Sequence, residues 1–318
     1  MDKWFLLTAG LVALLLGGCF SSCGTTEAPA SSFSVGSYIR PQFYSAGRVD
    51  GENMLACQDL ILFAAEPKGH GELYFKFEVW EEVNRKIRQK LEHKNIHLRL
   101  GVHHGDWRSA CCEEYRSRFV EAVARAIADY GFDGVDLDFE WPSTAEEYAD
   151  YSATIVALKA RLGEACLLSV SLHPTAYRIS PEAIRAADWI SLQCYGPRPL
   201  RFSFEMFESD VKEAIQYGIP ANKLVAGLPF YATAGRGVEG TVAYRQLVEA
   251  GVVTDSMVNQ VVWNGSRYMF NGQCTLRQKV KWARDMGLRG VMSWDLATDC
   301  AYSHPQSLQR AVVEAAIE

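Results

Sequence analysis

The chain has 318 residues and a net charge of -6, and 48% of its residues are hydrophobic and 12% aromatic. This composition can supply a sizeable core and excludes global disorder. No stretch rich in Lys and Arg runs along the chain, so we expect no nucleic-acid partner. The length fits one large domain.

Residues 1–18 predict an export signal, because Lys3 precedes an apolar run too short to span a membrane comfortably. The run ends in Leu-Gly-Gly-Cys, which resembles the lipidation motif of bacterial lipoproteins and would make Cys19 the lipid-carrying N-terminus. A plain secretory signal is the alternative. Residues 19–32, rich in Ser, Thr, Ala and Pro, predict a flexible tether. We therefore expect an exported cell-envelope protein, anchored to the membrane only by the lipid on Cys19, with its folded domain over residues 33–318.

The chain contains nine cysteines, and an exported protein can form disulfides, although the spacing fixes no pairing. Cys166 and Cys194 lie in apolar, strand-like runs and are expected to be buried small hydrophobes. The better candidates for disulfides are Cys57, Cys111, Cys112, Cys274 and Cys300.

Hydrophobic periodicity predicts strands and helices that alternate along the folded domain. Strands are expected at 33–40, 60–65, 96–102, within 131–141, and at 166–172, 189–195, 223–230 and 290–294. Helices are expected at 79–94, 113–130, 144–162, 181–187, 204–217, 275–286 and 305–317. About eight such units in under 300 residues indicate an α/β fold, a (β/α)8 barrel forming a single domain. An open doubly wound sheet competes, but no Gly-rich phosphate loop follows an early strand.

The strand that begins after Gly131 carries three acids at every second position. Asp136, Asp138 and Glu140 therefore share one face, while Val135, Leu137 and Phe139 share the other. The alternative is an edge strand whose acids lie on a solvated face, where they cost little free energy. This strand has an apolar face and follows an amphipathic helix, so we expect it to be buried. Unpaired buried carboxylates are costly, so function is the better reason for their presence.

Closely spaced carboxylates raise one another's proton affinity, so the outermost can serve as a general acid near neutral pH. Glu140, at the end of the strand, is the expected acid. Asp138 would orient it and share its proton, and Asp136 would tune Asp138. A metal site is the alternative, but alternate strand residues are about 6.6 Å apart, which is wide for a chelating cluster. We expect no metal and no cofactor.

Aromatic residues fall at the predicted ends of other strands. In a (β/α)8 barrel these ends meet at the active-site face. Sugar rings pack on aromatic faces, so this set indicates a carbohydrate site. The candidate walls of that site are Trp107, Tyr195, Tyr231 and Trp294.

The run from Phe132 to Glu140, FDGVDLDFE, resembles the Asp-x-x-Asp-x-Asp-x-Glu signature of the family 18 glycoside hydrolases, which are chitinases and endo-β-N-acetylglucosaminidases. The resemblance continues in the segments 193–195, 223–231 and 290–295 and covers nearly all of the folded domain. It implies a retaining reaction in which Glu140 protonates the glycosidic oxygen and the substrate's own 2-acetamido group attacks the anomeric carbon. In that scheme Asp138 and Tyr195 hold the acetamido group and Trp294 floors the sugar site. The expected substrate-binding residues are Trp294, Tyr231, Gln193, Tyr38 and Trp107.

The chain departs from the family pattern in three places. The third strand ends in residues 101–107, GVHHGDW, where chitinases often show Ser-x-Gly-Gly. Gly196 stands where many chitinases carry an Asp after the Tyr. Residues 231–289 are too few for the large α+β insertion that deepens the cleft of processive chitinases. We expect a shallower groove and no large insertion domain.

The leading hypothesis is an endo-acting hydrolase of β-1,4-linked N-acetylglucosamine. Chitin oligomers, the diacetylchitobiose core of N-glycans and peptidoglycan-derived chains stay open as substrates. The alternative is a catalytically weak or inactive, lectin-like glycan binder, although inactive relatives usually lose the acid that Glu140 supplies here. The expected partners are N-acetylglucosamine-containing glycans, and the expected state is a monomer.

Overall fold

The computed structural model describes residues 33–196, 198–235 and 240–318. The predicted signal peptide, tether and lipidation site at Cys19 lie outside these ranges. Within the described residues no helix combines the length and apolarity needed to cross a bilayer.

The core of the fold is a closed barrel of parallel strands, which confirms the predicted (β/α)8 architecture. In the described chain, the hydrogen-bonded order around the barrel is β1-β13-β8-β7-β6-β5-β4-β2, and β2 returns to pair with β1. The barrel strands are β1 (Ser34–Ile39), β2 (Asp59–Lys68), β4 (His97–His103), β5 (Gly134–Asp138), β6 (Leu167–Leu172), β7 (Trp189–Leu192), β8 (Leu224–Pro229) and β13 (Gly290–Trp294).

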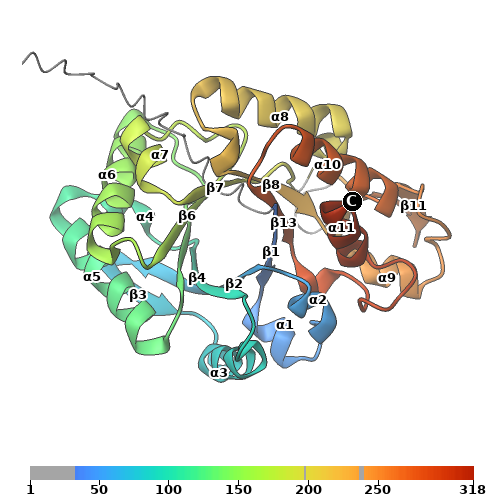
Figure 1. Cartoon of the computed structure of the whole chain (residues 1–318), viewed down its shortest axis with the longest axis horizontal. Coiled ribbons are helices and arrows are strands. Elements are labelled where there is room, and N and C mark those ends of the chain that lie inside the picture. The colour runs from blue at the N-terminus through green and yellow to red at the C-terminus, as the bar shows by residue number, and fades with distance from the viewer. Residues whose placement is uncertain (1–32, 197, 236–239) are drawn as a thin grey trace, which may run out of the picture. The chain divides into compact units, whose positions relative to one another are not determined.

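Helices lie around these strands, as α3, α5, α6, α8 and α10 show in Figure 1. Their ends follow ordinary capping chemistry. Thr144 and Glu147 form a capping box at the start of α6, and Gly131 ends α5 with a left-handed φ of 70°. The helices are α1 (Pro41–Ser45), α2 (Gly51–Leu55), α3 (Trp80–Leu91), α4 (Trp107–Cys111), α5 (Glu113–Tyr130), α6 (Ala145–Leu162), α7 (Pro181–Ala186), α8 (Phe204–Tyr217), α9 (Tyr244–Glu249), α10 (Gln273–Asp285) and α11 (Leu308–Ile317).

Side chains along β5 and the residue after it alternate between the core that packs against the helices and the interior of the barrel. Val135, Leu137 and Phe139 point outward and are buried in the core shared with the helices. The ring of Phe139 stacks on Trp107 of α4, with 5.5 Å between centroids. The other face of β5 is thereby turned into the barrel, where its acids meet residues from the facing strands.

The barrel interior is held together by Arg99 of β4, which is fully buried. Its guanidinium donates to both carboxylate oxygens of Asp59 on β2, and to the hydroxyl of Ser169 on β6. Its Nη1 also lies 3.7 Å from Oδ1 of Asp136 on β5. The ring of Trp189 on β7 covers the guanidinium, with 4.4 Å from Cζ to the ring centroid. One cation therefore links five strands beneath the carboxyl ends.

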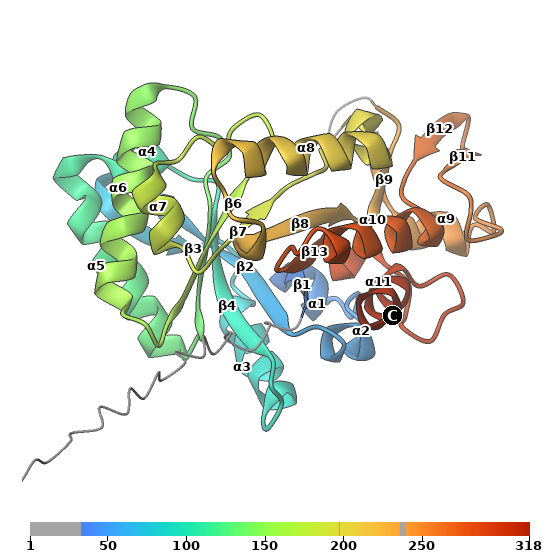
Figure 2. The ribbon, with the colours of Figure 1, turned by 45° about the horizontal axis from the view of Figure 1, so that its top comes forward.

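A small antiparallel sheet was not predicted from the sequence. It occupies part of the segment between β8 and β13 and, in the described residues, has the order β10-β9-β12-β11. Its strands are short, so their alternation gave no clear signal. Figure 2 shows α9, β11 and β12 at one end of the molecule. The strands are β9 (Tyr231–Thr233), β10 (Thr241–Ala243), β11 (Gln260–Trp263) and β12 (Ser266–Met269), and a further unpredicted strand, β3 (Glu72–Phe75), pairs with β2.

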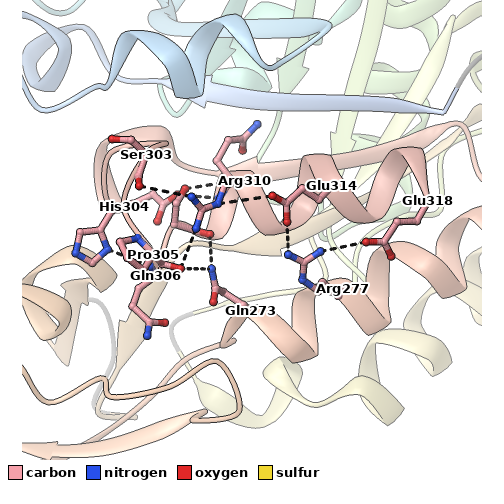
Figure 3. A network of polar contacts seen from close by, with 12 residues as sticks. Gln273, Arg277, Ser303, His304, Pro305, Gln306, Arg310, Glu314 and Glu318 are labelled. Carbon is pink, nitrogen blue, oxygen red and sulfur yellow. Dashed lines mark hydrogen bonds and ion pairs between the residues drawn. The ribbon is translucent and has the colours of Figure 1, made fainter.

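The C-terminal helix α11 is fastened to α10 by a polar network (Figure 3). The side-chain amide of Gln273 donates to the carbonyls of Pro305 and Ser307, at 3.0 and 2.9 Å. One turn later, Arg277 pairs with Glu314. These contacts hold α11 and the residues before it against α10.

The described cysteines are all free, so the disulfide candidates are wrong for this structure. Cys57, Cys111 and Cys300 are buried, where each packs as a small hydrophobe. Cys194 is buried as expected, and Cys166 is half-buried.

Replacing Arg99 with Met is expected to lower the free energy of unfolding by about 3–5 kcal/mol, because removal of one partner leaves the carboxylate of Asp59 buried without its counter-charge. The measurement is urea denaturation at pH 7. Arg125→Gln on the exposed face of α5 is the control and should stay within about 0.5 kcal/mol of the parent. An Arg99→Met protein as stable as the control would contradict a structural role for this ion pair.

Candidate active site

Three carboxyl groups run from the barrel interior to its surface along β5 and the residues that follow it. Asp136 is fully buried, Asp138 is 1% exposed, and the side chain of Glu140 is 29% exposed. This gradient arises because each step of two residues moves up one pleat of the same strand face. The outermost carboxyl is therefore the one that a bound molecule can reach.

Asp136 anchors the row at its base. One of its oxygens accepts a hydrogen bond from the hydroxyl of Tyr38 at 2.9 Å, and the other accepts from the hydroxyl of Ser169. Burial raises the pKa of Asp136, while the nearby charge of Arg99 and these two hydrogen bonds lower it. The group is fixed on both oxygens and is closed to solvent.

The side-chain amide of Gln193 connects the upper two acids. Its Nε2 lies 2.9 Å from Oδ1 of Asp138, 3.0 Å from Oγ of Ser171 and 3.5 Å from Oε1 of Glu140. The amide is 6% exposed and lies just beyond the end of β7. It thus gives both carboxyl groups a shared neutral donor.

Burial is the largest cause of raised pKa values at this site. It raises the pKa of Asp138 well above its ordinary value, and the charges of Glu140 and Asp136 raise it further. Burial also raises the pKa of Glu140, whereas the charge of His104 and the amide of Gln193 lower it. The Nδ1 atom of His104 lies 3.8 Å from Oε2 of Glu140. The Asp138 and Glu140 pair consequently retains a proton toward neutral pH.

A cavity of about 910 Å³ opens above these acids. Five of the predicted site residues line it: Glu140, Gln193, Tyr195, Tyr231 and Trp294. They come from the ends of four barrel strands, β5, β7, β8 and β13, as expected for the carboxyl ends of parallel strands. The cavity is the natural place for a ligand that reaches Glu140.

Aromatic rings form much of the cavity wall. Trp294 packs against Phe63 and Tyr38, with ring centroids 4.8 and 5.2 Å apart. Tyr195 and Tyr231 meet edge to face at 6.3 Å, and the Tyr231 hydroxyl donates to the carbonyl of Gly196 at 2.7 Å. The contacts keep these rings in place around an opening wide enough for sugar rings.

Two predicted substrate-binding residues lie elsewhere. Trp107 is buried in the core against Phe139, Phe119 and Tyr151, so the structure does not place it in the cavity. It starts helix α4 with its ring turned outward from the barrel, because the chain turns after β4. Tyr38 is 1% exposed and contacts Asp136 and Trp294 from beneath, so it supports the site without lining it.

Sequence reasoning missed several residues that line the cavity. Trp141 directly follows Glu140, and its position after an acidic strand was a usable signal. The arginines and the residues of β10 and α9 gave none, because the cavity combines loops far apart in sequence. The missed lining residues are Arg40, Phe43, Arg48, Phe63, Trp141, Arg198, Leu200, Arg201, Thr241, Val242, Ala243, Arg245, Gln246, Ala297 and Thr298.

No group of three or more His, Cys, Asp and Glu side chains in the described residues is arranged to hold a metal ion. Asp136, Asp138 and Glu140 are spread along one strand, and the first two already bind Tyr38 and Gln193. The chemistry that the site offers through its own residues is proton transfer by a partly protonated carboxyl group at a cavity suited to sugars.

The family model for glycosyl hydrolases family 18 matches residues 53–299, more than half of the chain. The chain belongs to this family. Its acidic row and barrel are therefore those of a glycosidase family, as the FDGVDLDFE motif suggested. Among curated relatives, a class V chitinase of Arabidopsis thaliana is 25% identical over 58% of this chain. The match spans 63% of that relative's length, so the chain corresponds to less than two thirds of it.

Solved structures share the fold at low sequence identity. The chitinase ChiB from the chitin utilization locus of Flavobacterium johnsoniae matches with a TM-score of 0.75 and 23% identity, over 90% of this chain and 94% of that one. Human YKL-39, described as a pseudo-chitinase with retained chitooligosaccharide binding, matches with a TM-score of 0.73 and 16% identity, over 90% of this chain and all of that one. The same barrel is thus found in proteins described as a chitinase and as a pseudo-chitinase.

Asp138→Asn is expected to stabilise the fold increasingly as the pH rises. Because the pKa of Asp138 is raised, the folded protein holds a proton that the unfolded chain releases above about pH 4. The parent therefore loses stability from about pH 4 upward, whereas the neutral variant escapes this loss. We expect a gain at pH 8 that is clearly larger than the gain at pH 6, and little gain at pH 4.

Thermal unfolding at pH 4, 6 and 8 measures this difference. Asp129→Asn, on the exposed face of α5, removes one surface charge and reports the effect of net charge alone. A gain for Asp138→Asn that is constant across the three pH values would show that Asp138 is not held protonated by the fold.

Proposed function

We propose that the protein is a retaining endo-glycoside hydrolase of β-1,4-linked N-acetylglucosamine that works by substrate-assisted catalysis. The observation that carries the proposal is the row from Asp136 to Glu140, whose outermost carboxyl group reaches the cavity. The membership of glycosyl hydrolases family 18 supports it. A chitin-type substrate is favoured, because the curated relatives that match are chitinases.

Glu140 is the general acid of the proposed reaction. It gives its proton to the glycosidic oxygen as the bond to the anomeric carbon breaks, and it then takes a proton from the attacking water. Its raised pKa keeps the proton available toward neutral pH. Partial exposure of the side chain at the cavity fits a group that exchanges protons in each half of the reaction.

The nucleophile is the carbonyl oxygen of the substrate's own 2-acetamido group. An ordinary retaining glycosidase needs a second carboxylate about 5 Å across the cleft from its acid. Among the described residues that line the cavity, Glu140 is the one carboxyl group. Asp138 lies on the same strand beneath it and is buried. This arrangement supports attack by the substrate.

Asp138 and Tyr195 would hold the acetamido group. Asp138 accepts from the amide of Gln193 on one oxygen, so its second oxygen can accept the acetamido N–H. The Tyr195 hydroxyl contacts Sδ of Met292 at 3.8 Å, a weak partner that leaves its proton free for a substrate carbonyl. Trp294 would floor the sugar ring, and Tyr231 would bound it at the side.

An exported, monomeric protein anchored at Cys19 completes the proposal. The apolar run before Leu-Gly-Gly-Cys supports export and lipidation. Chitin oligomers, the diacetylchitobiose core of N-glycans and peptidoglycan-derived chains all contain N-acetylglucosamine. A product assay with each, read by mass spectrometry, distinguishes them.

A glycan-binding protein without turnover is the second candidate, favoured by the likeness to the pseudo-chitinase YKL-39. The presence of Glu140 at the cavity, with both aspartates below it, favours catalysis instead. Hydrolysis and binding are separable by a single substitution.

Glu140→Gln is expected to reduce hydrolysis of N-acetylglucosamine oligomers by roughly 10²–10⁴-fold, because the general acid is lost while the shape of the cavity is kept. Initial rates and binding by calorimetry are measured on the same preparations. Binding within a few-fold of the parent is expected. Parent and variant that both bind without any turnover would support the glycan-binding candidate.

Gln193→Met is expected to move the basic limb of the pH profile of kcat/KM to higher pH. The amide of Gln193 lowers the pKa of both Asp138 and Glu140, so its removal lets both groups hold their proton at higher pH. The rate is measured from pH 4 to 9. A loss of rate with an unchanged profile would mean that Gln193 only shapes the cavity.

A further inference from the structure

The lining of the active-site cavity is strongly basic, although the chain as a whole carries a net charge of -6. Among the described residues that line it, five guanidinium groups face one carboxyl group, that of Glu140. The pKa of this carboxyl group is itself raised, which reduces its negative charge toward neutral pH. The five arginines are Arg40, Arg48, Arg198, Arg201 and Arg245.

Two of these arginines are neutralised by aspartates outside the lining. Arg40 pairs with the buried Asp295 and lies over the rings of Phe43 and Trp294. Arg201 pairs with Asp210 on α8. These two have structural reasons to be present, because each satisfies a mostly buried carboxylate.

The other three arginines satisfy no buried carboxylate among the described residues. In the ranges 33–196, 198–235 and 240–318, no carboxylate forms an ion pair with Arg48, Arg198 or Arg245. Arg245 is half-buried, and its Nε is shielded from solvent without a hydrogen-bond partner among the described residues. A shielded donor without an acceptor is costly, so its presence calls for an explanation.

Arg48 and Arg245 form a pair at one edge of the cavity. Both line the cavity and also an adjoining hollow of about 410 Å³, so both stand at the boundary between the two. Arg48 lies in the loop between α1 and α2, and Arg245 lies on α9 beside the small sheet. Three carboxyl groups, those of Asp50, Glu249 and Asp299, line the adjoining hollow and not the cavity, so the two arginines stand between an acidic hollow and the cavity. Two distant segments thus bring two cations to one place.

A neutral sugar chain leaves these charges unbalanced. The hydroxyl and acetamido groups of a chain of N-acetylglucosamine alone can hydrogen-bond to a guanidinium, but they carry no opposite charge. A guanidinium instead matches a carboxylate, phosphate or sulfate with two parallel hydrogen bonds. A cleft lined by one sign of charge also draws in ligands of the opposite sign.

We propose that the preferred substrate is an acidic N-acetylglucosamine glycan, whose oxyanion groups are bound by Arg48 and Arg245 at the edge of the cavity. This inference rests on the proposed hydrolase function and names its substrate class. The acetamido sugar occupies the site above Glu140, and the anionic substituent of a neighbouring sugar meets the arginine pair. Arg198, in the loop after β7, also lines the cavity and adds to the attraction along it.

Three pentasaccharides test the proposal. The first is a neutral N-acetylglucosamine pentamer, the second alternates N-acetylglucosamine with N-acetylmuramic acid, whose lactyl ether carries a carboxylate, and the third is a sulfated N-acetylglucosamine pentamer. Binding is measured by calorimetry on the full chain carrying Glu140→Gln, at 20 and 300 mM salt. The KM of the parent protein for each pentamer gives a second measurement that does not depend on that variant.

The parent site is expected to bind an acidic pentamer at least roughly 10-fold more tightly than the neutral one at low salt, with the preference shrinking at high salt. Arg48→Gln and Arg245→Gln should each reduce this preference by roughly 3- to 10-fold. Arg125→Gln on α5 is the matched control and should not change it. Preference for the muramic or for the sulfated chain identifies the carboxylate or the sulfate as the group recognised.

Tighter binding of the neutral pentamer, or a preference that both arginine variants retain, would overturn the inference while leaving hydrolysis of neutral chains as proposed. Conversely, the parent protein could bind the acidic pentamers in a charge-dependent way but hydrolyse none of the three. That result would overturn the proposed hydrolysis and still support binding of an anionic glycan at the arginine pair. The two failures are therefore distinguishable in one set of measurements.

Discussion

The site depends on one constraint, which is that three acids lie in a row on one largely buried face of β5 and the residues after it. At the bottom, Asp136 shares the barrel interior with Arg99, whose charge offsets the cost of burying it. At the top, Glu140 reaches solvent. Between them, no cation in the described part of the chain pairs with Asp138, so burial and two neighbouring acids together raise its pKa. A proton held between Asp138 and Glu140 reduces this repulsion, and it is the proton that the proposed acid catalysis would use.

Most of the hydrogen bonds to Asp136 and Asp138 come from neutral donors. Tyr38, Ser169 and Gln193 satisfy the carboxyl oxygens without supplying a positive charge. A lysine or arginine beside Asp138 would lower its pKa and empty the pair of its proton. The cations of the cavity stand instead at its edge, where they can meet a ligand. The proposed catalysis and the proposed recognition would thus use opposite charges in separate places.

The segment that carries the small sheet forms part of the cavity wall at the open end of the barrel. The expectation of a shallow groove came from the number of residues between β8 and β13. The structure shows that this segment contributes β10 of the small sheet, and the helix α9 that follows it, to the cavity wall, including Arg245. A short insertion therefore adds to the cavity wall in this structure.

The alternation of strands and helices, which indicated a (β/α)8 barrel, and the row of acids followed from the sequence, because both patterns depend on local periodicity. Alternation placed Asp136, Asp138 and Glu140 on one face, and helical spacing with capping residues marked α5 and α6. The predicted roles of these acids and of the substrate-binding residues stay predictions until the variants are measured.

Only the tertiary structure decided which side chains share the cavity. Trp107 follows a strand end like the other aromatics, yet the turn into α4 sends its ring into the core. Arg48 and Arg245 are almost 200 residues apart and have no shared pattern, yet they line one edge. The partners of Arg99 come from separate strands. Such neighbours depend on barrel closure and loop paths, which arise from long-range packing and leave no periodic signal in the chain.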